Sequence, residues 1–228
     1  MGATGTASLM SPDFGQQMRI VNKPGSSSVI AFLVIFGLLV SAYLLLRPDA
    51  SVEALAALTD PAKLATLETR RAANPRLLKC VYWLHDAKVR GRVPEAIIAK
   101  AQAATNSTGA RAELVKKSLL RNLDIAEKLG CLTPENLERL RRGSSPAITL
   151  GPYAGQIAEV DHIVPVSVVP ELDKELANLE LMPAVINRKK GAKIGARQLD
   201  YIKRFVSAGI ISEQVAERVR SNAPREFP

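Results

Sequence analysis

The chain has 228 residues and carries 31 Lys and Arg against 22 Asp and Glu, a formal net charge of +9. No long repeat, collagen-like pattern or low-complexity tract occurs, which excludes a fibrous or repeat protein. The positive charge favours a polyanionic partner, either nucleic acid or anionic lipid headgroups. Cys80 and Cys131 are isolated, so they fit one disulfide or two buried thiols but no Cys₄ zinc site.

The N-terminal part of the chain divides into a tail and an apolar run. Residues 1–28 are rich in Gly, Ser and Thr and predict a disordered tail. Residues 29–46 contain neither a charge nor a proline. As a helix they reach about 27 Å, close to the roughly 30 Å of a bilayer core, so they predict a single transmembrane helix. A cleaved signal peptide, with Val40-Ser41-Ala42 as its cleavage site, is the main alternative, but the segment before the apolar run is too long for it.

Residues 47–147 predict a basic helical region, because apolar side chains recur there at helical spacing. Asp60-Pro61 and Thr133-Pro134 indicate helix starts, each a capping residue followed by proline at the first helical position. Another helix is predicted over Ala110–Gly130, with the glycine as its stop. From Arg70 to Arg142 sixteen Lys or Arg stand against seven Asp or Glu. The basic helical surface that carries this surplus could bind a polyanion, bind anionic lipid, or be an ordinary solvated surface.

His85 is one of the two histidines and lies in this helical region. Its neighbours in the run Val81-Tyr82-Trp83-Leu84-His85-Asp86 include two aromatic residues. Such a neighbourhood is ordinary in a core. We therefore expect His85 to be a packed, hydrogen-bonded side chain of a helix and not a metal ligand.

Residues 148–195 hold the most informative pattern of the chain. It reads Glu159-Val160-Asp161-His162-Ile163-Val164-Pro165, then Asn178-Leu179-Glu180-Leu181-Met182, and then Asn187-Arg188-Lys189-Lys190-Gly191. An acidic residue, a histidine and a carboxamide, followed by a cluster of cations, are what metal-assisted cleavage of a phosphodiester needs.

Each of these residue types suits one task of that chemistry. Asp161 and Asn187 offer hard oxygen ligands to Mg²⁺ or Mn²⁺, while water and substrate phosphate complete the coordination. A neutral His162 can accept the proton of the water that attacks phosphorus. The flanking phosphates are expected to be held by the cations near Asn187, namely Arg188, Lys189, Lys190 and Lys193.

The pattern resembles the HNH endonucleases, the ββα-metal nucleases that include colicin-type toxins, homing and restriction enzymes and RNA-guided nucleases. The resemblance covers residues 148–195 and follows the variant whose third letter is Asn instead of His. It implies a strand that ends in Asp161-His162, a loop, a second strand that begins at Asn178, and a short helix that carries Asn187. It also implies that Asp161 is the first metal ligand and His162 the general base. Asn178 then braces the loop and orients the histidine, and Asn187 is the second ligand.

The segment also departs from that family. It lacks the Cys-x-x-Cys pairs with which many relatives bind a structural zinc, so packing must hold the fold. The loop glycines of the family are replaced by residues 168–172, which leaves the loop geometry open. Neighbours on a regular strand point to opposite faces, so Asp161 and His162 are expected to share a site only where the backbone is distorted. Pro165 favours an early end of the strand.

Residues 196–228 predict two C-terminal helices that pack on this unit. The helices are expected over Ile194–Phe205 and Ile211–Arg220, separated at Ala208-Gly209. Basic residues of the first helix can extend the phosphate track. The whole chain is thus expected to be mainly α, with a small ββα unit and one N-terminal transmembrane helix.

The function that fits best is a single-pass, membrane-anchored HNH-type endonuclease that hydrolyses DNA with a divalent metal. DNA is preferred to RNA through the family resemblance alone. A membrane-tethered protein with a degenerate HNH fold that only binds nucleic acid is the first alternative. A toxin-like nuclease effector, with an immunity or regulatory partner, is the second.

The charges that flank the apolar run do not determine on which side of the membrane the nuclease lies. Arg19 and Lys23 precede the apolar run, and Arg47 and Lys63 follow it, a tie by the positive-inside rule. A free nuclease would endanger the chromosome. We therefore favour an N-terminus inside the cytoplasm and a nuclease outside it.

Overall fold

The computed structural model describes residues 1, 30–37 and 49–222. Residues 30–37 are helical. The rest of the predicted transmembrane helix, like the predicted disordered tail beyond Met1, lies outside the described residues. Among those that are described, no helix is both long enough and apolar enough to cross a bilayer. The described residues 49–222 belong to one compact unit, and residues 30–37 belong to another.

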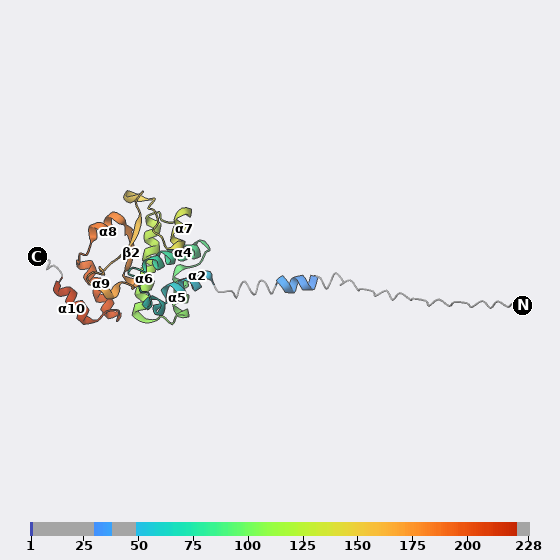
Figure 1. Cartoon of the computed structure of the whole chain (residues 1–228), viewed down its shortest axis with the longest axis horizontal. Helices are drawn as coiled ribbons and strands as arrows, with labels where there is room; N and C mark the ends of the chain where they lie inside the picture. The colour runs from blue at the N-terminus through green and yellow to red at the C-terminus, as the bar shows by residue number, and fades with distance from the viewer. Residues whose placement is uncertain (2–29, 38–48, 223–228) are drawn as a thin grey trace. The chain divides into compact units, whose positions relative to one another are not determined.

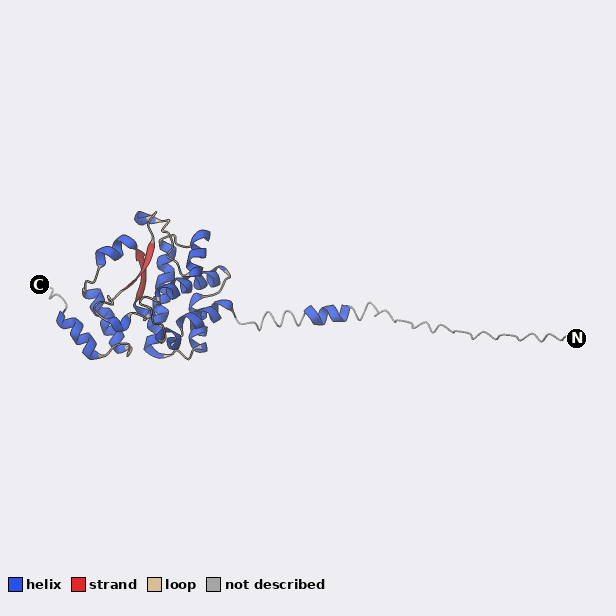
Figure 2. Cartoon of the chain, in the orientation of Figure 1, coloured by secondary structure: helices blue, strands red, loops and turns tan. Residues whose placement is uncertain are grey.

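The compact unit is mainly helical, as expected, and contains a two-stranded sheet (Figures 1 and 2). Its α-helices are α2 (Ala50–Thr59), α3 (Pro61–Ala65), α4 (Asn74–Val89), α5 (Pro94–Ala104), α6 (Gly109–Lys128), α7 (Pro134–Arg142), α8 (Ala184–Lys190), α9 (Ala196–Ser207) and α10 (Glu213–Asn222). The strands are β1 (Ala158–His162) and β2 (Leu179–Pro183). Short 3₁₀ helices lie at Gly151–Tyr153 (η1), Pro170–Leu172 (η2) and Leu176–Asn178 (η3).

The helix boundaries follow the capping signals in the sequence. Asp60 caps α3, where its Oδ1 accepts a hydrogen bond of 2.9 Å from the Ala62 N–H, and Thr133 caps α7 in the same manner. Helix α6 matches the predicted helix over Ala110–Gly130 to within two residues. Gly130 lies just beyond its end at φ 66°, and a Cβ there would meet Thr149 Oγ1 at 2.2 Å. Only glycine therefore suits this turn.

The main core is apolar and joins the helices to the sheet. Leu84 of α4 and Leu119 of α6 belong to the same buried cluster as Val160 of β1 and Leu181 of β2. The sheet lies between this helical body, which it contacts through α4 and α6, and helix α8 on its other side (Figure 2). A second apolar cluster packs α9 and α10 against the loop that follows β1, with Phe205 fully buried within it. The sheet is thus held by packing, as the absence of zinc-binding cysteine pairs requires.

A polar link fixes the sheet on α6. Asn122 is fully buried, and its Oδ1 accepts a hydrogen bond of 2.6 Å from the Leu181 N–H. Its Nδ2 donates to the Leu179 carbonyl at 3.0 Å. One turn earlier, Ser118 Oγ donates to the carbonyl of Leu176 at 2.8 Å. The bonds from Asn122 pair two backbone groups on the outer edge of β2, which a two-stranded sheet would otherwise leave unpaired.

The two cysteines and His85 lie in the helical part of the compact unit. Cys80 and Cys131 are both free and buried, which selects the alternative of two buried thiols. Burial raises the pKa of Cys80 to about 12 and that of Cys131 to about 11, so both stay protonated. His85 lies half-buried in α4, as expected for a packed helical side chain, but the hydrogen bonding predicted for it is wrong at one ring nitrogen. Its buried Nδ1 has no hydrogen-bond partner among the described residues.

Candidate functional site

The segment that carries the sequence pattern has the order strand, strand, helix. β1 and β2 pair antiparallel, with Ala158 opposite Pro183 and His162 opposite Leu179. Helix α8 follows β2 directly. Asp161 and His162 are the last two residues of β1, and Asn187 lies in α8. Asn178 is the last residue of η3, so the second strand begins one residue later than the resemblance implies, while Asp161, His162 and Asn187 lie in the expected elements.

One cavity brings together three of the predicted residues. It has a volume of about 190 Å³ and contains Asp161, His162 and Asn187 in its lining. The expected distortion of the strand is not observed, because β1 pairs regularly to its last residue and burial alternates along it. The cavity lies at the end of the strand, and side chains from both faces reach it there. Asp161 and His162 therefore reach the same cavity because the strand ends at His162, and no distortion of the strand is needed.

His162 is held in one tautomer by the loop that follows β1. The side chain is 3% exposed, and its Nε2 lies 3.0 Å from the carbonyl oxygen of Asp173. A carbonyl oxygen only accepts hydrogen bonds, so Nε2 carries the proton and Nδ1 keeps a lone pair. Burial lowers the pKa of His162 below its ordinary value, and the Asp173 carbonyl opposes this only in part. The ring is therefore neutral at pH 7 and can act as a base at Nδ1.

Asn178 braces the backbone just after the histidine. It is fully buried, and its side chain forms two hydrogen bonds with Val164, accepting from the N–H at 2.8 Å and donating to the carbonyl at 2.9 Å. Its own carbonyl accepts from the Ile163 N–H at 2.7 Å. Three bonds to adjacent residues fix the direction in which the chain leaves β1. The loop-bracing role that the sequence predicts for Asn178 is thus geometrically available, whereas its catalytic role stays a prediction.

The two predicted metal ligands contact charged neighbours. Asp161 Oδ2 accepts a hydrogen bond from the Lys190 ammonium at 2.5 Å. Asn187 Nδ2 donates to Glu159 Oε2 at 2.8 Å, which reserves the amide oxygen for another partner. A carboxylate that already binds a cation and a carboxamide oxygen in the same cavity fit a hard divalent ion.

Few protein ligands are available to such an ion. Within the described residues no group of three or more His, Cys, Asp or Glu side chains is arranged to hold a metal. Two oxygen ligands, from Asp161 and Asn187, would leave the remaining positions to water and to substrate oxygens. This is the coordination that Mg²⁺ favours.

The predicted phosphate-binding residues differ in their surroundings. Arg188, Lys189 and Lys193 are exposed on and just after α8. Lys190, by contrast, is turned inward, with its side chain 14% exposed and its ammonium on Asp161. Three of the four are therefore open to solvent, and the fourth is engaged within the site.

Sequence reasoning missed Arg70 and Arg71 as residues of this site. Both are exposed, lie in the loop before α4, and line the same cavity as His162. Arg71 has a positive φ of 58°, and its backbone N–H donates to both carboxylate oxygens of Asp173 at 3.2 Å. Asp173 thus ties the arginine loop and the histidine together. The adjacent arginines were a visible basic signal, but nothing in their spacing indicated that packing would bring them to a cavity about 90 residues further along the chain.

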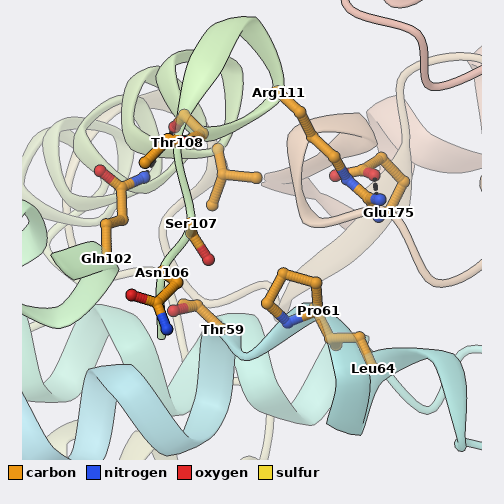
Figure 3. Close-up of a pocket in the computed structure, with 11 residues that line it drawn as sticks. Thr59, Pro61, Leu64, Gln102, Asn106, Ser107, Thr108, Arg111 and Glu175 are labelled. Carbon is orange, nitrogen blue, oxygen red and sulfur yellow. Dashed lines mark hydrogen bonds and ion pairs between the residues drawn. The ribbon is translucent and has the colours of Figure 1, made fainter. Parts of the chain in front are cut away.

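A different cavity, of about 230 Å³, lies among α2, α3, α5 and α6 (Figure 3). None of the predicted site residues lines it. Its one acidic residue, Glu175, is 4% exposed and lies with Oε2 2.8 Å from the Arg111 guanidinium, an ion pair whose angles are not those of a hydrogen bond. The charges of this cavity neutralise one another, so it offers no reactive group comparable to His162.

Comparison of the chain with protein-family models, with curated proteins and with solved structures gave no match. A function is therefore inferred from the residues themselves and from their arrangement in the cavity at the end of β1.

Proposed function

We propose that the protein is a divalent-metal-dependent endonuclease of the HNH type that hydrolyses phosphodiester bonds of DNA. The observation that supports this most is the cavity at the end of β1, which is lined by Asp161, His162 and Asn187 together. A base, two oxygen ligands and nearby cations are the groups that phosphodiester hydrolysis requires.

His162 is the general base in this proposal. Its Nδ1 lone pair accepts the proton of the attacking water, while Nε2–H stays on the Asp173 carbonyl and keeps the ring in place. Because burial keeps the ring neutral, the base needs no prior loss of a proton at pH 7. Asn178 keeps the backbone beyond the histidine in position through its bonds to Val164.

Asp161 and Asn187 would hold the metal with their oxygens. When bound, a Mg²⁺ or Mn²⁺ ion supplies Lewis-acid stabilisation of the departing 3′ oxygen. Asn187 is oriented by its bond to Glu159, so its amide oxygen is the atom left to bind. Asp161 would have to release the Lys190 ammonium in order to bind such an ion.

The cations around the cavity bind the phosphates on either side of the scissile bond. Arg70 and Arg71 line the cavity itself. Arg188, Lys189 and Lys193 are exposed and lie close in sequence to Asn187 and Gly191, which line the cavity. Sequence-independent contacts to phosphate of this kind give salt-dependent affinity and no base specificity.

The apolar run at residues 29–46 is proposed to anchor the nuclease in a membrane, with the catalytic unit outside the cytoplasm. The argument is its length without a charge or a proline. Alkaline phosphatase fused to the C-terminus, which is active only outside the cytoplasm, should then be active in cells. Activity of a cytoplasmic reporter alone at that position would overturn the orientation.

Plasmid nicking by the purified full-length protein tests the proposal. Supercoiled DNA should be nicked in Mg²⁺ or Mn²⁺ and stay intact in EDTA. The Asp161→Asn protein should fall to the EDTA level, because a neutral amide binds a divalent ion far more weakly than a carboxylate does. Salt-sensitive DNA binding without cleavage in any metal would contradict the nuclease and favour a degenerate fold that only binds.

A further inference from the structure

Lys190 is the one residue of the predicted basic cluster that lies inside the site. Its ammonium donates to Asp161 Oδ2 and to the His162 carbonyl, each at 2.5 Å. Both charged side chains of the pair are largely buried, with 14% of Lys190 and 16% of Asp161 exposed. Its helix neighbours Arg188 and Lys189 are exposed. Lys190 thus already contributes a positive charge at the carboxylate that the proposed function assigns to the metal.

Lys190 and a divalent ion compete for the same carboxylate. An ion on Asp161 would lie within one side-chain length of the Lys190 ammonium, and like charges at that separation repel. Asp161 has no other cation within ion-pair distance among the described residues. Binding of the metal therefore displaces the lysine.

The displaced ammonium can move without refolding. Lys190 is the last residue of α8 and is followed by Gly191, and its four-carbon stem is flexible. Around the cavity, the groups that Lys190 would approach include Arg70 and Arg71, which are basic. A phosphate bound among these cations is the anion that replaces the lost carboxylate.

We propose that Lys190 is an exchangeable counter-ion, which pairs with Asp161 in the metal-free protein and binds a substrate phosphate once a divalent ion takes Asp161. Metal binding and DNA binding then strengthen each other, because each removes an obstacle to the other. This inference rests on the proposed function, since it assumes that Asp161 binds a metal. It adds a positioning residue that couples the two binding events.

The simpler reading is that Lys190 only ties the end of α8 to the end of β1. Under that reading its removal loosens the site and weakens metal binding. Under the exchange its removal takes away a competitor and tightens metal binding. The two accounts thus predict opposite signs for one measurement.

The measurement is Mn²⁺ binding to the full-length protein without DNA, followed by the electron paramagnetic resonance signal of the free ion. Lys190→Met should bind Mn²⁺ about threefold to tenfold more tightly than the wild type. Lys190→Gln, which keeps a donor for the His162 carbonyl, should do the same. Lys189→Met removes an equal charge from the exposed face of α8 and should change the affinity by less than about twofold.

Unchanged or weaker Mn²⁺ binding in both Lys190 variants would overturn the exchange and leave the proposed nuclease standing. Absence of Mn²⁺ binding in every protein, the wild type included, would instead overturn the metal site on which the proposed function rests. A thermal unfolding curve for each variant establishes that the folded protein is being titrated.

DNA affinity provides the second arm, in a His162→Ala background that prevents cleavage. With Lys190 present, Mn²⁺ should tighten DNA binding about tenfold, since the released ammonium gains a phosphate. With Lys190→Met added, the gain should shrink to about twofold, which is the part due to the ion alone. An equal gain in both proteins would contradict the coupling.

Discussion

The helical region at residues 50–142 and the strand-strand-helix segment at residues 158–190 use their interiors differently. The helical interior is built mainly from leucine, isoleucine and alanine, such as Leu84 and Leu119. The segment buries His162 and Asn178, and each is hydrogen-bonded to the backbone of the loop after β1. The first region supplies stability, and the second uses that stability to hold polar groups that would be costly to bury alone.

The substitution that should separate stability from activity most clearly is one that creates a cavity in the helical core. Leu84→Ala, at a fully buried position of α4, should lower the free energy of unfolding by about 2–5 kcal/mol, because it removes packed methyl groups and leaves a void. Urea denaturation measures this. Nicking activity at a temperature where the variant remains folded should stay near the wild-type level. A large loss of activity with unchanged stability would show that the helices do more than support the site.

The next largest effect on stability is expected at Asn122, whose hydrogen bonds link α6 to β2. Asn122→Ala leaves the buried Leu181 N–H without its partner and should cost about 2–4 kcal/mol, although the Leu179 carbonyl still accepts from Arg121 and Ser118. Asp124→Ala on the same helix is the matched control, since that side chain is 53% exposed and should change stability by less than about 0.5 kcal/mol. Equal effects of the two substitutions would mean that the buried link does not hold β2.

A smaller and purely local effect is expected at Asp173. Asp173→Ala removes the carboxylate that binds the Arg71 N–H but keeps the carbonyl that binds His162. The rate of cleavage should fall about tenfold, as is usual when an orienting partner outside the reacting atoms is lost. Glu171→Ala, an exposed change two residues away, should leave kcat/KM unaltered. A Glu171→Ala protein as slow as Asp173→Ala would point to a general loosening of the loop.

Sequence reasoning succeeded in the segment because its chemistry restricts residue type at each position. Asp161, His162 and Asn187 fall in the expected elements, and Asn178 stands one residue before the strand that it was expected to begin. Amphipathic spacing and capping residues likewise predicted the helices but carry no information on which loop meets which strand. Arg70 and the rest of its loop are brought to the site by tertiary packing. The contact between Lys190 and Asp161 also depends on tertiary packing. Pairwise contacts across long separations were therefore beyond the sequence.

The mildest effect expected is on stability as the pH falls. Burial lowers the pKa of His162 in the folded protein below the value of about 6.5 in the unfolded chain. The unfolded chain therefore binds a proton more readily below that pH, and stability should decrease as the pH is lowered from about 7 towards 5. His85 has a lowered pKa for the same reason and contributes in the same direction. His162→Gln should flatten the urea midpoint against pH, and an unchanged slope would contradict a buried, neutral His162.

The central claim, that His162 is the base of a metal-dependent nuclease, is tested most directly by single-turnover plasmid nicking in Mn²⁺. His162→Ala should reduce the rate by about 10² to 10⁴ while DNA affinity stays within about threefold. His85→Ala, which removes the other histidine of the chain, should nick at the wild-type rate. Equal rates for the His162→Ala protein and the wild type would contradict the account.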